Sequence, residues 1–289
     1  MTYAQPTYLD EALELLARQP ASIVSGGTDF YPARLERRMA EHVLDIHALA
    51  ELKNITVNDD NEVRIGAGAT WSDIIKAPLP LAFDGLKLAA REVGSVQIQN
   101  RATLVGNLCN ASPAADGVPP LLILNAQVEL ASHRGRRTIP LAEFILGNRQ
   151  TACRSDELVC AVIIPASETV GHSTFLKLGA RKYLIISVSM VAAKFVIDEI
   201  GNINEAAISV GSCSLVAQRL RSLEEVLIGQ PINGDIDQLV KPEHLTCLSP
   251  IDDVRSTATY RIDASLELVR RAIRALARTL AHTLAKGAV

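Results

Sequence analysis

Apolar residues recur at helical spacing in the first part of the chain and then give way to short apolar runs. Residues 7–18 place leucines three and four positions apart, and this spacing predicts a helix. Residues 22–25 and 43–46 are short apolar stretches that predict strands, and residues 30–38 between them predict a second helix. The chain up to about residue 50 is therefore predicted to form a small α/β unit.

The next stretch, up to about residue 170, alternates between strand and helix patterns. Residues 62–69 alternate like a strand, and Thr70 and Asp73 can cap a helix that runs to Lys76. Residues 86–93 predict a further helix. Two runs around Gly135, residues 128–132 and 137–140, predict a hairpin, and residues 158–164 predict an apolar strand that stops at Pro165.

The second half of the chain has the pattern of a sheet covered by helices. A polar stretch over residues 165–173 marks a domain boundary. Residues 187–198 and 205–212 predict two antiparallel strands joined near Gly201. Residues 264–286 predict a long amphipathic helix, whose apolar side carries Leu266, Val269, Ile273, Leu276 and Leu280.

Composition narrows the class of protein. The chain has 289 residues, 48% hydrophobic and 21% charged, with a net charge of -3. These values predict a globular protein with a substantial core, and they do not favour binding to nucleic acid. No transmembrane helix or signal peptide is expected, so a cytoplasmic location is predicted. Five widely spaced cysteines without a C-x-x-C pair, and six histidines without an H-x-x-x-H pair, predict that the chain holds no metal.

Two segments carry residue types suited to holding a polar ligand. The first follows an apolar strand and contains Val24, Ser25, Gly26, Gly27, Thr28 and Asp29. Glycines allow the backbone to approach a phosphate, and successive amides can form an anion-binding nest. The same residues also suit an ordinary tight turn.

The second segment, residues 100–116, is rich in small and amide residues but has no acid–base pair and no nucleophile. Such a loop suits ligand binding by many hydrogen bonds and suits bond-breaking catalysis poorly, so no catalytic residue is assigned. A structural loop explains it equally well. The G-x-G-x-x-G fingerprint is absent from the chain, and a Rossmann dinucleotide site is therefore not supported.

Together these segments resemble the paired flavin signature of the FAD subunits of molybdenum hydroxylases. This family includes the xanthine dehydrogenase FAD subunit and the carbon monoxide dehydrogenase medium subunit. The resemblance continues in order along the chain, through residues 97–103, 135–144, 156–158, 164–165, 175–182 and 253–261. It therefore covers most of the sequence.

The resemblance implies an α/β (α+β) fold. A two-part FAD-binding domain of the vanillyl-alcohol-oxidase-like type would cover residues 1–170, with subdomains of about 1–50 and 51–170. A C-terminal sheet-plus-helices domain of the carbon monoxide dehydrogenase flavoprotein type would cover residues 173–289. The chain would be an oxidoreductase subunit that passes electrons through FAD to an external acceptor such as NAD. Partner chains would be a small subunit with 2Fe-2S clusters and a large molybdopterin subunit.

The resemblance also assigns roles to individual residues. Residues 24–29 would wrap the FAD diphosphate. Thr103, Val105, Gly106 and Asn107 would form a second wall around phosphate and flavin. Further contacts with the same cofactor would come from Asn110, Asp116, Val159 and Lys177.

The chain departs from the family pattern at two positions. The family usually has two glycines before Asn107, whereas Val105 replaces the first, and a β-branched residue disfavours positive φ. Ile185 stands about where the family often has an aspartate, so no contact is assigned there. A subunit that has lost flavin and serves as a scaffold is the alternative favoured by Val105. A self-contained flavin oxidase is a further alternative, although no candidate base stands out.

Overall fold

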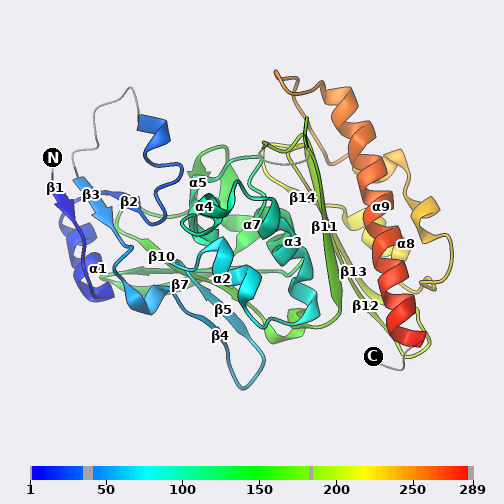
Figure 1. Cartoon of the computed structure of the whole chain (residues 1–289), viewed down its shortest axis with the longest axis horizontal. Helices are drawn as coiled ribbons and strands as arrows, with labels where there is room; N and C mark the ends of the chain where they lie inside the picture. Colours follow the sequence, from blue (N-terminus) through cyan, green and yellow to red (C-terminus); the bar gives the residue numbers. More distant parts are fainter. Residues whose placement is uncertain (1, 35–41, 182–184, 286–289) are drawn as a thin grey trace. The chain divides into compact units, whose positions relative to one another are not determined.

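The computed structural model describes residues 2–34, 42–181 and 185–285, which form two compact units (Figure 1). The first unit contains residues Met1–Ala77, Val93–Ser112 and Ala126–Ala166. The second contains Pro78–Glu92, Pro113–Asn125 and Ser167–Val289. Each unit is therefore assembled from segments that are separated in the sequence.

The first unit begins with a small parallel sheet and a helix that packs its apolar side inward. The strands are ordered β1 (Thr2–Ala4), β3 (His42–Asp45) and β2 (Ser22–Val24), and α1 (Leu9–Arg18) lies between β1 and β2 in the sequence. Leu9, Leu13 and Leu16 of α1 are buried. The helix and both strands predicted here are confirmed. Of the predicted helix over 30–38, only a 3-10 turn, η1 (Pro32–Arg34), is described, and residues 35–38 lie outside the described residues.

The larger sheet of the first unit is antiparallel. Its order is β4 (Ile55–Val57), β5 (Val63–Gly66), β10 (Leu158–Ile164), β6 (Gln127–Ser132) and β7 (Gly135–Pro140). A separate hairpin joins β8 (Ile145–Gly147) to β9 (Gln150–Thr151). The register of β10 against β6 shifts between Val159 and Ala161, which marks a bulge. The predicted strands and the β6–β7 hairpin are confirmed.

Short helices complete the first unit: η2 (Ala50–Leu52), α2 (Trp71–Lys76), α4 (Val96–Gln99), α5 (Leu104–Asn110) and α7 (Leu141–Phe144). Helix α2 has the predicted capping box, because Thr70 and Asp73 each accept from the other's backbone amide. Helix α5 corrects the expectation of a loop. Thr103 caps its first turn and Leu104 and Leu108 are fully buried, so burial stabilises a helix that the local sequence does not predict.

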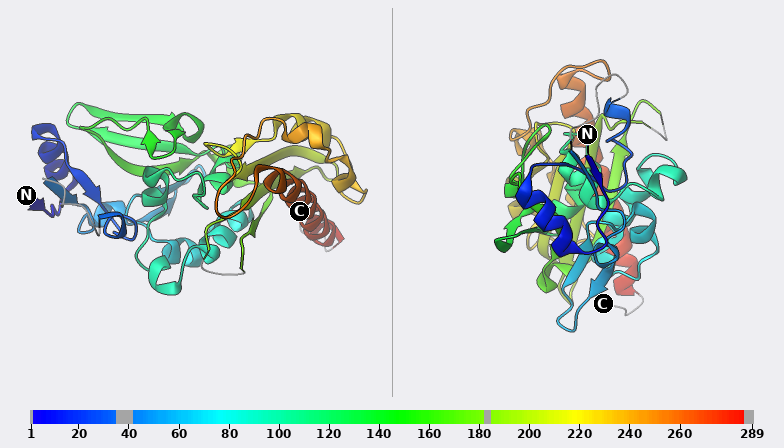
Figure 2. Two further views of the ribbon diagram at one scale, coloured as in Figure 1. Left: turned by 90° about the horizontal axis from the view of Figure 1, so that it is seen from above. Right: turned by 90° about the vertical axis from the view of Figure 1, so that its left-hand side faces the viewer.

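The second unit is an antiparallel sheet with helices on both faces (Figure 1, Figure 2). The strand order is β11 (His172–Leu178), β12 (Ser189–Ile197), β13 (Ile203–Gly211) and β14 (Gln218–Arg219). One face packs on α8 (Arg221–Leu227) and α9 (Ala258–Ala285) through a core that includes Val191, Phe195 and Leu276. The other face packs on α3 (Asp84–Glu92) and α6 (Val118–Leu122). Short 3-10 turns fill the connections: η3 (Leu81–Phe83), η4 (Ala166–Thr169), η5 (Ile236–Leu239) and η6 (Pro242–Leu245).

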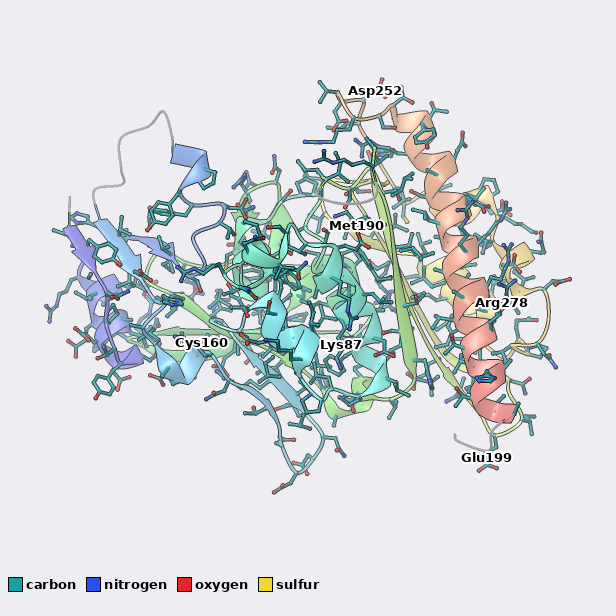
Figure 3. The ribbon with its side chains drawn as sticks, viewed as in Figure 1. Lys87, Cys160, Met190, Glu199, Asp252 and Arg278 are labelled. Atoms are coloured by element: carbon teal, nitrogen blue, oxygen red, sulfur yellow. The ribbon has the colours of Figure 1, made fainter. Side chains whose placement is uncertain are left out.

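The face that carries α3 and α6 is closely packed. Met190 of β12, labelled in Figure 3, is fully buried, and a Cβ on Gly211 of β13 would lie 2.5 Å from its Cε and 2.9 Å from Pro119 Cγ. The amide of Gly85 in α3 donates to Ser173 Oγ at 2.7 Å. These contacts hold α3 and α6 against the strands.

The predicted strands and helices of the second half are confirmed, with shifted bounds. Helix α9 begins at Ala258, six positions before the predicted start at 264, and Lys286 lies outside the described residues. Lys182, the last residue of the motif at 175–182, also lies outside them. In the described ranges, no helix is both long and apolar enough to cross a membrane. The α/β (α+β) class is confirmed, while the domain division near residue 170 stays a prediction.

Candidate cofactor site

The glycine turn after β2 lies directly against the second predicted segment. Gly27 has a φ of 75°, which favours glycine. A Cβ on Gly26 would lie 2.1 Å from the Arg101 carbonyl oxygen and 2.9 Å from Ala102 Cα. The backbone can approach this closely only because residue 26 has no side chain. Two segments far apart in the sequence are thus held in contact.

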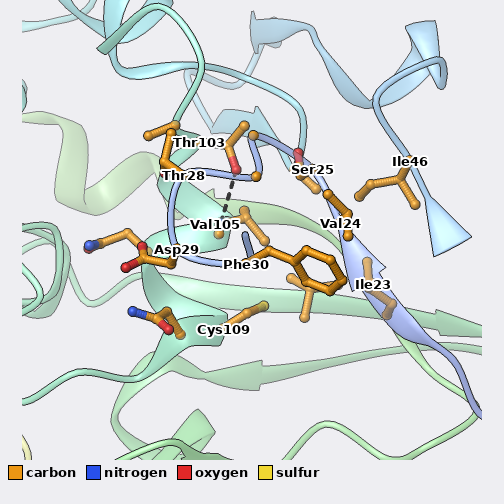
Figure 4. Close-up of a pocket in the computed structure, with 18 of the residues that line it drawn as sticks. Ile23, Val24, Ser25, Thr28, Asp29, Phe30, Ile46, Thr103, Val105 and Cys109 are labelled. Atoms are coloured by element: carbon orange, nitrogen blue, oxygen red, sulfur yellow. Dashed lines mark hydrogen bonds between the residues drawn. The ribbon is translucent and has the colours of Figure 1, made fainter. Parts of the chain in front are cut away.

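The second segment presents the first turn of α5. Thr103 Oγ1 accepts a hydrogen bond from the Gly106 amide at 3.0 Å, which caps the helix (Figure 4). Val105 is the second residue of this helix and has no positive φ. A β-branched side chain is therefore compatible with the backbone at position 105. The departure from the family pattern does not disrupt this wall.

The two segments line one cavity of about 560 Å³ within the first unit. This volume lies in the range of small-molecule and cofactor sites, roughly 300–1,000 Å³. Leu158 and Val159, at the start of β10, also line the cavity. Twelve residues assigned from the sequence line the cavity: Val24, Ser25, Gly26, Gly27, Thr28, Asp29, Thr103, Val105, Gly106, Asn107, Asn110 and Val159.

The lining fits a phosphate-bearing dinucleotide such as FAD. The Ser25 hydroxyl is buried and has no hydrogen-bond partner among the described residues, so a bound ligand would satisfy it. Asp29 and Arg149 supply the formal charges among the described lining residues. Phosphates would therefore be held mainly by backbone amides and hydroxyls around Gly26, without a basic cluster.

Arg149 lines the cavity but was not found from the sequence. It lies in the two-residue turn between β8 and β9 with a φ of 61°. Its amide donates to the Ala111 carbonyl oxygen at 2.9 Å, and its guanidinium donates to Asn110 Oδ1. These bonds hold the turn against the C-terminal end of α5. A glycine at this position would have predicted a turn with positive φ, whereas an arginine gives no such local signal.

Two thiols, Cys109 and Cys153, also line the cavity, although the sequence assigned no site role to either. Cys109 has exposed surface that lines the cavity, and desolvation of its thiol by the surrounding protein raises the pKa to about 12. Partial burial raises the pKa of Cys153 to about 11. Both thiols are therefore protonated and weakly nucleophilic near neutral pH. Trp71 also lines the cavity and is 1% exposed, as expected of a packing residue.

Asp116 and Lys177 belong to the second unit and are not among the residues that line the cavity of the first unit. They form a buried ion pair with 2.6 Å between Lys177 Nζ and Asp116 Oδ2, and Ser187 donates to Asp116 Oδ1 at 2.7 Å. Burial raises the pKa of Asp116, and it outweighs the opposing effects of Lys177 and Ser187. Their contact with the cofactor stays a prediction.

The basic run at residues 133–137 covers the turn between β6 and β7 and the start of β7. Its arginines pair with nearby carboxylates: Arg134 with Asp156, Arg136 with Glu129, and Arg137 with Glu157. The described residues contain no group of three or more histidine, cysteine or acidic side chains placed to hold a metal ion. Neither feature adds a second candidate site.

Comparison with known proteins gives the family. Residues 1–167 match the family described as the FAD binding domain in molybdopterin dehydrogenase, and residues 174–276 match the CO dehydrogenase flavoprotein C-terminal domain. The chain is 34% identical over 245 residues to the nicotinate dehydrogenase FAD-subunit of Eubacterium barkeri, with 82% of each chain covered. It is 30% identical over 277 residues to the xanthine dehydrogenase FAD-binding subunit of Escherichia coli O157:H7, with 94% of each covered.

A solved structure agrees with these matches. Carbon monoxide dehydrogenase from Hydrogenophaga pseudoflava, in a form that lacks the Mo-pyranopterin moiety of its molybdenum cofactor, superposes with a TM-score of 0.86. The identity is 25%, and the match covers 96% of each chain. The family resemblance inferred from the sequence is confirmed. The chain belongs to the FAD-binding subunits of the molybdenum hydroxylases, of the xanthine dehydrogenase and carbon monoxide dehydrogenase type.

Proposed function

We propose that this chain binds FAD in the cavity of the first unit and relays electrons within a molybdenum hydroxylase complex. The observation that carries the proposal is the shared cavity, which the glycine turn at Gly26 and the capped helix α5 line together. Bound FAD would supply the ability to accept and release electrons singly or in pairs. The chain itself would bind and orient the cofactor.

Individual residues would share this task. The amides around Gly26 and Gly27, with the hydroxyls of Ser25 and Thr28, would hold the diphosphate. Val159 would pack against the cofactor, as the resemblance implies. Asp116 and Lys177 are retained as proposed contacts from the resemblance alone.

The partners belong to the same proposal. Relatives are named as FAD subunits, and the related carbon monoxide dehydrogenase contains a molybdenum cofactor. We infer a small subunit with 2Fe-2S clusters and a large molybdopterin subunit. Electrons would reach this chain from the clusters and leave to an external acceptor such as NAD, in the cytoplasm. The scaffold alternative loses its support, since Val105 fits the helical wall.

Reconstitution tests the proposal. The purified chain should bind FAD, show flavin absorbance bands, and lose emission from Trp71, its single tryptophan, which lines the cavity. The chain alone should not oxidise an organic substrate, whereas the complex with both partner chains should reduce an acceptor. A complex that is fully active without FAD on this chain would refute the proposal.

A further inference from the structure

One side of the cavity presents an aromatic ring among aliphatic side chains. Phe30 follows the glycine turn, and Figure 4 shows its ring pointing towards Ile23 and Val24, while Asp29 points the other way. Ile46 lines the same side, just after β3. This end of the cavity is therefore apolar and has one flat surface.

The Phe30 ring is held in place by its neighbour. Tyr31 meets it edge to face, with ring centroids 5.2 Å apart and planes at 84°. Tyr31 itself covers Gly27, since a Cβ there would lie 2.8 Å from Tyr31 Cε2. The orientation of the ring is thus tied to the turn that would hold the diphosphate.

Polar side chains line other parts of the cavity. Thr103, Asn107 and Asn110 come from the cap and body of α5, and Arg149 comes from the β8–β9 turn. FAD has a planar ring at each end. The isoalloxazine has a row of hydrogen-bonding atoms along one edge and needs polar partners, whereas adenine can be held largely by stacking.

We propose that Phe30 stacks on the adenine ring of FAD and so determines specificity for the adenine dinucleotide. The inference rests on the proposed assignment of this cavity to FAD. It adds a cofactor-positioning residue from outside the two glycine and amide segments. Phe30 would bind the end of the cofactor that does not carry the redox-active ring.

Fragment binding tests this role without measuring activity. ADP carries the adenine and the diphosphate but no flavin. Phe30→Leu should weaken FAD and ADP binding by the same factor, on the order of tenfold, while Phe30→Tyr should restore both. Tyr8→Leu is the matched control, because Tyr8 is an exposed aromatic residue of the first unit outside the cavity. Calorimetric titration gives the affinities, and thermal unfolding shows whether each variant is folded.

A measurement on the unaltered protein covers the case in which Phe30→Leu fails to fold. In protein that is deuterated except on its phenylalanine rings, the complex with FAD should show nuclear Overhauser contacts between the Phe30 ring and adenine H2 or H8. Contacts to the isoalloxazine methyl groups would overturn the proposal. The proposal would also be overturned if Phe30→Leu lost affinity for FAD but kept its affinity for ADP, or if it bound both as the unaltered protein does. An unaltered protein that binds FAD but not ADP would overturn it too. If the unaltered protein bound no FAD, the proposed function would fail instead.

Discussion

Replacement of Gly26 by alanine should separate the two walls of the cofactor cavity. The added Cβ would lie 2.1 Å from the Arg101 carbonyl oxygen, more than 1 Å inside the 3.4 Å at which ordinary contact begins. Both nearby groups are backbone, so no side chain can rotate away. Gly26 has no positive φ, and the effect is therefore steric alone.

The size of the effect follows from that displacement. Overpacking of this kind costs about 1–3 kcal/mol of unfolding free energy. A shift of about 1 Å in a binding wall should weaken FAD binding on the order of 10- to 100-fold. Quenching of Trp71 emission would give the FAD affinity, and thermal unfolding of the FAD-free protein would give the stability loss.

Gly234→Ala is the control for this variant. Its added Cβ would have 3.4 Å to the nearest atom, the Pro231 carbonyl oxygen, and residue 234 lies in the second unit. This variant should bind FAD as the unaltered protein does. If Gly26→Ala also bound FAD with full affinity and melted at the same temperature, the contact between the two walls would not matter for the site.

Three further variants or modifications test other features. Asp116→Ala should lower the free energy of unfolding by about 3–5 kcal/mol near neutral pH, because buried Lys177 would lose its counter-ion. Adding Lys177→Met should recover part of this loss in urea unfolding. Arg137→Gln should lower the free energy of unfolding by about 2 kcal/mol at neutral pH. Arg137 lowers the pKa of Glu157, so the ion pair stabilises the fold fully above the ordinary glutamate pKa of about 4.3. The stability difference between Arg137→Gln and the unaltered protein should shrink in urea titrations as the pH falls below that value and through the lowered pKa of Glu157. Alkylation of Cys109, whose pKa is raised to about 12, should accelerate steadily from about pH 7 to about pH 10 and be blocked by FAD in peptide mass spectra.

The glycine turn that lines the cavity could be predicted from the sequence. Two glycines directly after an apolar strand are a strong local signal, and Gly26 and Gly27 both have structural reasons to be glycine. The residues assigned to the second wall line the same cavity, but they form a helix where a loop was expected. Gly106 and Asn107 are poor helix formers, and α5 exists because Leu104 and Leu108 are buried by the rest of the unit.

Other parts of the site depend on contacts that are distant in the sequence. Arg149 reaches the cavity because a hairpin tip bonds to the end of α5, and no local pattern encodes this approach. The ion pair between Asp116 and Lys177 could not be predicted from local sequence either. Asp116 and Lys177 were each assigned to the cofactor, and their pairing joins the segment before α6 to β11 within one unit.

The interleaved order of the two units restricts how such proteins can be recombined. Helices α3 and α6 come from the N-terminal half of the chain, yet they cover one face of the sheet built from β11 to β14. A chimaera joined near residue 167 would pair a foreign sheet with these helices and would have to re-match Met190 and Pro119. Exchange between relatives should therefore succeed only when Pro78–Glu92 and Pro113–Asn125 are transferred together with the C-terminal half.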